Sequence, residues 1–255
     1  MPVVNNDGIK IYYEVEGAGP PVILHHGFAG SIEDWREFGY VEHLKNDYQL
    51  ILIDARGHGK SDKPHDPQAY TIENRVNDVI TVLDDIKVDT AHFFGYSYGG
   101  RLAFELALNT PKRMESFIVS GIGARGQDPD FLQNRIKNLE TGPLGLVKTF
   151  EQFGEISHKM RERLLQNDCE ALIAILKTPW PYRGDDLQYM KEPFLLLGGE
   201  FDPGFTTIED ASERLPDSTF IPLPGLNHMQ TAIQIDKVLP HIKEFLTRVS
   251  KKQAR

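Results

Sequence analysis

The chain has 255 residues, of which 40% are hydrophobic and 25% charged, as expected for a globular protein with one large core. Its formal net charge of −9 argues against a binding surface for nucleic acid or for an anionic membrane. A single cysteine, Cys169, excludes a disulfide within the chain, and no C-x-x-C or H-E-x-x-H spacing indicates a metal site. No basic and apolar leader begins the sequence, and no apolar run approaches the roughly 20 residues of a membrane span, so we expect a cytoplasmic protein.

Apolar spacing assigns alternating strands and helices to the first half of the chain. Short alternating or apolar runs predict strands at 9–15, 22–25, 48–53, 91–94 and 115–120. Helical spacing of apolar residues predicts helices at 31–44, 71–86 and 100–108. Strands that alternate with helices are typical of a parallel sheet with helices on both faces.

The strand pattern is lost between residues 121 and 186, where amphipathic stretches predict several helices. Beyond this segment, strands are expected at 193–198 and 219–221, and helices at 208–215 and 229–249. We therefore predict an α/β fold with a mostly parallel, doubly wound sheet, formed by residues 1–120 and 187–255. The helices of residues 121–186 are predicted to form a lid, inserted between two strands, over the carboxyl edge of the sheet.

The pentapeptide Gly95-Tyr96-Ser97-Tyr98-Gly99 lies between an apolar strand and a helix rich in Ala and Leu. A serine at the tip of such a sharp turn adopts a sparsely allowed backbone conformation, so the residues two before and two after it must lack bulk. Gly95 and Gly99 meet that demand. A bare G-x-S-x-G also occurs by chance in flexible loops, but the setting between strand and helix favours a nucleophile at Ser97.

A serine hydroxyl needs a base within hydrogen-bond reach, and that base needs an acceptor that fixes its tautomer. Among nine histidines, His228 is the best placed, because it follows the last predicted strand and precedes the last helix. Asp202 follows the strand at 193–198 and is the natural acid, with Glu200 as its rival two residues earlier. The chain order Ser97, Asp202, His228 is the order that this serine motif requires.

An acyl-transfer enzyme also needs two donors for a developing oxyanion. The loop at residues 26–30 follows a predicted central strand, and it could present the Phe28 amide opposite the Tyr98 amide. Taken alone, this loop could equally be an ordinary connection from strand to helix. His25 and His26 lie at the same strand end, where either could orient backbone groups or simply pack.

With these motifs in place, the sequence resembles α/β-hydrolases of the lidded, single-domain type over nearly its whole length. The resemblance rests on His26-Gly27-Phe28, Asp54-Ala55-Arg56-Gly57-His58-Gly59-Lys60-Ser61, Gly95-Tyr96-Ser97-Tyr98-Gly99-Gly100, Gly199-Glu200-Phe201-Asp202 and Gly225-Leu226-Asn227-His228. A serine in place of an aspartate nucleophile disfavours haloalkane dehalogenases and soluble epoxide hydrolases. The loop after His26-Gly27 lacks the Gly-Gly-Pro-Gly of proline iminopeptidases, and the usual pattern of bacterial C–C bond hydrolases is absent. What remains is similar to small carboxylesterases, enol-lactone hydrolases and cofactor-free perhydrolases.

Residues and resemblance together give one leading hypothesis, hydrolysis of a small carboxylic ester, lactone or thioester, with no cofactor and no metal. The expected partner is a small apolar ester-type molecule, with no nucleic acid and no membrane span. Side chains expected to line its pocket are His26, Phe131, Phe150, Phe153, Trp180 and Tyr182. Two alternatives stay open: the same triad could support C–C bond hydrolysis or perhydrolysis, or the protein could sense a small molecule with little turnover. The oligomeric state stays open as well.

Overall fold

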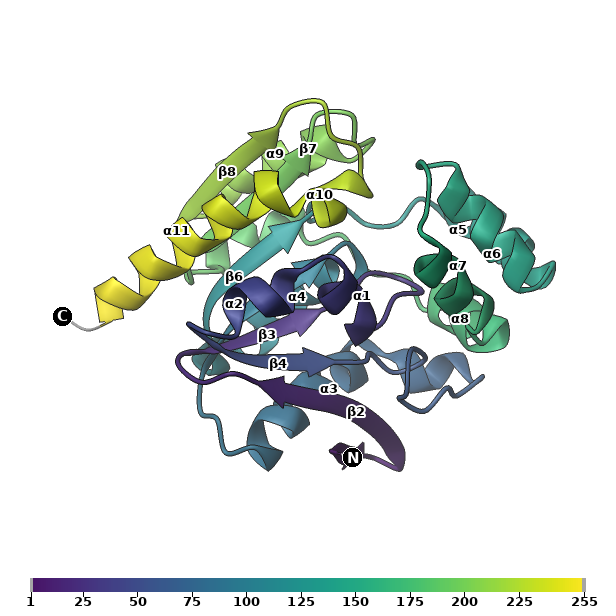
Figure 1. Ribbon diagram of the computed structural model, residues 1–255, viewed down its shortest axis with the longest axis horizontal. Coiled ribbons are helices and arrows are strands. Elements are labelled where there is room, and N and C mark those ends of the chain that lie inside the picture. The colour runs from purple at the N-terminus through teal and green to yellow at the C-terminus, as the bar shows by residue number, and fades with distance from the viewer. Residues whose placement is uncertain (1, 254–255) are drawn as a thin grey trace.

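The computed structural model describes residues 2–253, with side chains described to residue 250. The strands are β1 (Val3–Asn6), β2 (Ile9–Glu16), β3 (Pro21–His25), β4 (Gln49–Ile53), β5 (Ala91–Tyr96), β6 (Met114–Ser120), β7 (Phe194–Gly199) and β8 (Ser218–Leu223). In the described residues they form one eight-stranded sheet in the order β1-β2-β4-β3-β5-β6-β7-β8 (Figure 1). β2 runs antiparallel to β1 and β4, and every pair from β4 to β8 is parallel. The predicted α/β fold with a mostly parallel sheet is confirmed.

Helices cover both faces of this sheet (Figure 1). They are α1 (Ile32–Glu37), α2 (Tyr40–Leu44), α3 (Ile72–Asp85), α4 (Tyr98–Asn109), α9 (Phe205–Arg214), α10 (Gln230–Ile233) and α11 (Ile235–Gln253). Adjacent residues of β5 separate the two layers: Phe93 packs in the core with α3 and α4, whereas Phe94 packs in the core with α1, α2 and α11. This alternation follows from the two-residue period of a strand, and it buries the central strands on both sides.

A block of helices is inserted between β6 and β7, as predicted. It consists of α5 (Pro129–Glu140), α6 (Pro143–Glu151), α7 (His158–Leu165) and α8 (Cys169–Leu176), and a 3₁₀ helix at Gly184–Tyr189 follows it. The block lies to one side of the sheet, where β3 and β4 point toward it (Figure 1). We call residues 121–186 the lid, and we keep the division of the chain at these residues as a prediction.

Two predicted helices are each split in the structure. The helix expected at 31–44 is divided into α1 and α2 because Gly39 adopts a left-handed conformation with φ of 89°. The helix expected at 229–249 is divided into α10 and α11 at Gln234, whose ψ of 64° is not helical. Strand β1 was not predicted; it forms a hairpin with β2 through Asp7 and Gly8, both with positive φ.

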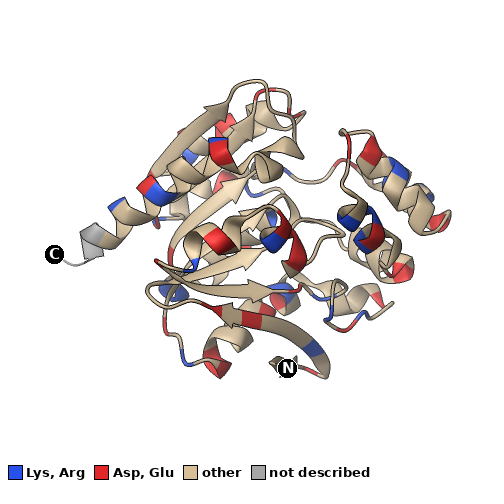
Figure 2. Cartoon of the chain, viewed as in Figure 1, with Lys and Arg blue, Asp and Glu red and all other residues tan. Residues whose placement is uncertain are grey.

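Charged residues of both signs are mixed along the exposed helices in the view of Figure 2. In that view Lys and Arg do not gather on one element, although Asp and Glu outnumber them in the sequence, 37 to 28. Among the helices described, none combines the length and the apolar character that a membrane crossing needs.

Candidate active site

Ser97 occupies a strained turn between β5 and α4, with φ of 52° and ψ of −103°. Two flanking glycines make this turn possible through close backbone contacts. A Cβ atom on Gly95 would lie 2.3 Å from the carbonyl oxygen of Gly99, and one on Gly99 would lie 2.2 Å from that of His25. The backbones therefore approach too closely for any side chain at either position, as the sequence pattern predicts.

The turn brings Ser97 next to His228, which comes from the loop between β8 and α10. The Ser97 hydroxyl lies 2.9 Å from Nε2 of His228, and Nδ1 of His228 lies 2.7 Å from Oδ2 of Asp202. Because the Nδ1 proton is donated to the carboxylate, Nε2 is free to accept the serine proton. Glu200, the rival acid in the sequence, instead accepts a hydrogen bond from the Gly225 amide at 3.1 Å.

Neighbouring groups hold the carboxylate and the imidazole in place. Oδ1 of Asp202 accepts a hydrogen bond from the Gly204 amide at 2.7 Å, which orients Oδ2 toward His228. The His228 carbonyl accepts hydrogen bonds from the hydroxyls of Tyr96 at 3.1 Å and Thr231 at 2.7 Å. Burial raises the pKa of Tyr96 far above its usual range, so its hydroxyl stays protonated and continues to donate.

Two residues that line the cavity at Ser97 have backbone amides without a hydrogen-bond partner in the described residues. Phe28 and Tyr98 both line the cavity at the serine, and none of the hydrogen bonds in the described residues uses the amide of either one. The loop that carries Phe28 is joined to the start of α4 by a hydrogen bond from the Gly99 amide to the His26 carbonyl at 3.2 Å. Ala29, the next residue, has a positive φ of 61°. Among the described residues, both amides are therefore unpaired donors that belong to residues lining the cavity at Ser97.

His26 orients backbone groups, and His25 packs. Nδ1 of His26 lies 2.8 Å from the Gly27 carbonyl, and its Nε2 accepts a hydrogen bond from the Ala55 amide at 3.1 Å. The His25 ring stacks on His26 with centroids 5.5 Å apart. Burial, with the neighbouring His26, lowers the pKa of His25 to about 3, so this imidazole is neutral in the folded protein.

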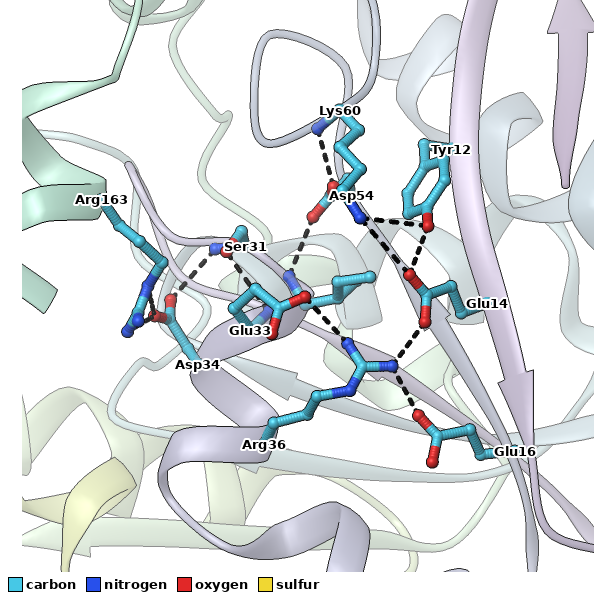
Figure 3. A network of polar contacts seen from close by, with 11 residues as sticks. Tyr12, Glu14, Glu16, Ser31, Glu33, Asp34, Arg36, Asp54, Lys60 and Arg163 are labelled. Carbon is cyan, nitrogen blue, oxygen red and sulfur yellow. Dashed lines mark hydrogen bonds and ion pairs between the residues drawn. The ribbon is translucent and has the colours of Figure 1, made fainter. Parts of the chain in front are cut away.

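A polar network joins the start of α1 to the lid, and Figure 3 shows it from close by. Asp34 accepts hydrogen bonds from the Ser31 amide at 3.0 Å and from Nη2 of Arg163 in α7 at 2.7 Å (Figure 3). The Asp54 carboxylate accepts hydrogen bonds from the amides of Ile32 and Lys60, each at 2.8 Å. The start of α1 is therefore bonded both to the loop at residues 54–60 and to α7 of the lid.

The cavity at Ser97 has a volume of about 190 Å³. An apolar cavity of about 150 Å³ admits benzene, so this one suits a small substrate. Five of the six predicted pocket residues line it: His26, Phe131, Phe150, Phe153 and Trp180. The sixth, Tyr182, does not line this cavity: it is 52% exposed, and its hydroxyl accepts a hydrogen bond from Arg214 at 2.9 Å.

The cavity wall also contains four arginines that were not predicted there: Arg101, Arg125, Arg135 and Arg163. Arg101 lies one helical turn after Ser97, and that spacing could have placed it near the nucleophile. Arg135 lies on α5 in the lid, and the sequence alone does not orient a lid helix against the core. The lining is therefore not wholly apolar, in contrast to the expected pocket.

Comparison with known proteins agrees with this architecture. Residues 20–139 match the family model described as alpha/beta hydrolase fold. A Bacillus subtilis protein named putative 2-succinyl-6-hydroxy-2,4-cyclohexadiene-1-carboxylate synthase is 26% identical, over 96% of this chain and 97% of its own length. The enol-lactonase from Burkholderia xenovorans superposes with a TM-score of 0.88 at 21% identity, over 96% of this chain and all of that one (100%). A thermophilic esterase from Thermogutta terrifontis, solved with malate bound, gives a TM-score of 0.82 at 26% identity, over 97% of both chains. The chain therefore has the α/β-hydrolase fold.

Proposed function

We propose that this protein is a serine hydrolase that cleaves a small carboxylic ester through an acyl-enzyme intermediate. The observation that carries the proposal is the hydrogen-bonded series from the Ser97 hydroxyl to His228 at 2.9 Å and from His228 to Asp202 at 2.7 Å. Ser97 is the nucleophile, His228 the general base and Asp202 the group that orients the imidazole. The free amides of Phe28 and Tyr98 beside the serine support the same reaction.

Acylation begins when the Ser97 oxygen attacks the ester carbonyl carbon and its proton passes to Nε2 of His228. The carbonyl π electrons move to the oxygen, whose negative charge the amides of Phe28 and Tyr98 stabilise, each by about 3 kcal/mol in comparable sites. Asp202 stabilises the positive charge that forms on the imidazole. When the intermediate collapses, the bond to the alcohol breaks and His228 returns the proton to the leaving oxygen.

Deacylation repeats these steps with water as the nucleophile. His228 takes one proton from a water molecule, whose oxygen attacks the acyl carbon, and the same two amides stabilise the second oxyanion. The Ser97 oxygen then leaves with the proton held by His228. The balance is one ester and one water converted to one acid and one alcohol, with the enzyme restored.

The name of the Bacillus subtilis relative provides a second candidate. That protein is called a synthase rather than a hydrolase, and it matches this chain over 97% of its own length. A non-hydrolytic reaction that uses the same serine, histidine and aspartate is therefore the alternative. C–C bond hydrolysis, perhydrolysis and small-molecule sensing are further alternatives, and the assay described next tests them as well.

The test is a steady-state assay with p-nitrophenyl esters of increasing acyl length. We expect turnover that peaks at a short chain, because the cavity is small, and that is lost in Ser97→Ala and after treatment with a serine-directed phosphonate. Ser212→Ala is the matched control, since this α9 hydroxyl donates only to the Glu209 carbonyl. Stoichiometric phosphonate labelling of Ser97 without turnover of any ester would contradict the esterase proposal and favour the alternatives.

A further inference from the structure

Two arginines from different parts of the fold line the cavity. Arg101 lies on α4, where its amide donates to the Ser97 carbonyl at 3.1 Å, so it sits one turn along from the nucleophile. Arg135 lies on α5 of the lid, and its guanidinium is 4.4 Å from the centre of the Phe28 ring. The Arg101 side chain thus lies on the helix that begins at the nucleophile, and the Arg135 side chain contacts the loop that carries the Phe28 amide.

Neither guanidinium has an acidic partner. Among the described residues, no carboxylate lies within ion-pair distance of Arg101 or Arg135. Nη1 of Arg101 donates to the carbonyl of Arg125 at 2.7 Å, and Arg135 contacts aromatic rings rather than an acceptor. By contrast, Arg163, which lines the same cavity, forms an ion pair with Asp34 at 2.7 Å.

The acids on the cavity wall are already engaged by other groups. Asp34 accepts from Arg163, and Asp202 accepts from His228.

Burial and the neighbouring Arg125 and Arg135 lower the pKa of Arg101 to about 10, and burial lowers the pKa of Arg135 to about 10. Both groups are still charged near neutral pH.

Charges removed from water are costly unless an opposite charge lies beside them. In this cavity the protein itself supplies no opposite charge to either guanidinium, which leaves a place for one on a ligand. A guanidinium presents paired donors whose planar geometry matches a carboxylate. The apolar remainder of the wall, which includes Phe150, Phe153 and Trp180, suits the carbon skeleton that carries it.

We infer that Arg101 and Arg135 form a subsite for a free carboxylate, and that the substrate is a small ester or lactone that carries this carboxylate in addition to the bond that is cleaved. The reaction named here rests on the proposed function, whereas the binding of a carboxylate does not. The small volume of the cavity, about 190 Å³, keeps the carboxylate only a few carbon atoms from the scissile carbonyl.

Binding is tested by calorimetric titration of the wild-type protein with glutarate and with glutaramide, its uncharged analogue, at low ionic strength. We expect glutarate to bind at least about tenfold more tightly, since a hydrogen bond to a charged group contributes about that factor or more. Arg101→Gln and Arg135→Gln should each weaken glutarate binding by about tenfold or more. Lys137→Gln, an exposed cation on the same helix as Arg135, should leave it unchanged.

Arg135→Lys keeps the positive charge and should retain part of the glutarate affinity that Arg135→Gln loses. This variant therefore distinguishes the loss of the charge from a folding defect. Equal binding of glutarate and glutaramide would overturn the inference, as would an equal loss in Lys137→Gln. Tighter binding of inorganic phosphate than of glutarate would also overturn it, because the subsite would then select a different anion.

Kinetics separate this inference from the proposed function. The p-nitrophenyl monoester of glutaric acid is compared with its neutral methyl ester, and we expect a lower KM for the acid that rises in Arg101→Gln and Arg135→Gln. Turnover of both esters without preference would remove the subsite and leave the esterase proposal intact. Selective glutarate binding without turnover of either ester would remove the esterase proposal and leave the subsite intact.

Discussion

Arg163 of the lid donates to Asp34 of α1 at 2.7 Å (Figure 3). This ion pair joins the lid to the core beside the loop at residues 26–30, which carries the Phe28 amide. The other oxygen of Asp34 accepts from the Ser31 amide at 3.0 Å, at the end of that loop. A second contact lies close by, because the Asn167 side chain donates to the Ala29 carbonyl at 3.1 Å. The lid and this loop are therefore coupled through Asp34 and through Asn167.

We predict that Arg163→Gln destabilises the protein by about 1–3 kcal/mol, because it leaves the Asp34 carboxylate without its cation. Hydrogen exchange should become faster in α7 and in the loop at residues 27–31. The matched control is Arg161→Gln on the same helix, whose ion pair with Glu151 is exposed and should contribute less than about 1 kcal/mol. Urea unfolding measures both variants, and equal stability of the two would show that the Arg163 contact does not anchor the lid.

The turn at Ser97 is predicted to tolerate no side chain at Gly99. In Gly99→Ala the new Cβ would lie 2.2 Å from the His25 carbonyl oxygen, so strand and helix must separate. We expect a loss of at least about 2 kcal/mol in stability and a large fall in ester turnover. Gly126→Ala serves as control, because the nearest atom to its Cβ would be at an ordinary 3.4 Å. Wild-type activity in Gly99→Ala would mean that the turn does not depend on this close approach.

The identity of the acid can be tested with two matched amide substitutions. Asp202→Asn keeps the shape of the side chain but fixes His228 in the wrong tautomer, and we predict a fall in kcat of about 10³–10⁴-fold. Glu200→Gln alters the neighbouring carboxylate, which bonds only to the Gly225 amide, and should change kcat by less than about twofold. The reverse ranking would assign the acid role to Glu200.

Buried His25 predicts a specific dependence of stability on pH. Its pKa is about 3 in the folded protein and about 6.5 when unfolded, so the unfolded chain binds the extra proton between these values and stability falls as the pH falls. In His25→Gln this proton uptake is absent. The difference in unfolding free energy between wild type and variant should therefore shrink by about 1.4 kcal/mol per pH unit from pH 6 to 4.

Urea unfolding at several pH values measures this slope. Leu144→Ala is the control, because this side chain is 59% exposed and does not titrate, so its difference from wild type should not vary with pH in the same range. A constant difference between wild type and His25→Gln would mean that His25 is protonated in the folded state as well.

Most of the fold could be predicted because the strands of the parallel sheet are buried on both faces and appear as short apolar runs. The run Phe93-Phe94 shows this, since one ring lies in each layer of the core. The breaks at Gly39 and Gln234 were missed because apolar spacing continues across them, and the glycine at 39 was the only local indication of a break. The hairpin of β1 and β2 had a usable signal in Asp7-Gly8, a dipeptide typical of two-residue turns.

The candidate site was predictable in part for a similar reason. Ser97, Asp202 and His228 each follow a strand, and the carboxyl ends of parallel strands meet at one edge of a sheet, so chain position alone brings them together. The catalytic roles of these residues stay predictions. Lid residues lack such a rule: Tyr182 was expected in the pocket and lies outside it, whereas Arg135 was not expected there and lines it. The orientation of a lid helix depends on tertiary packing that its own sequence does not specify.

The role of Ser97 as an activated nucleophile is tested most directly by mass spectrometry of the protein after reaction with diethyl p-nitrophenyl phosphate. This reagent transfers a phosphoryl group to an activated serine and releases p-nitrophenol. We predict one adduct per chain, located on Ser97, absent in Ser97→Ala and formed at least about a hundredfold more slowly in His228→Gln. An unmodified Ser97, or labelling at the same rate in His228→Gln, would contradict the claim that His228 activates Ser97 as a nucleophile.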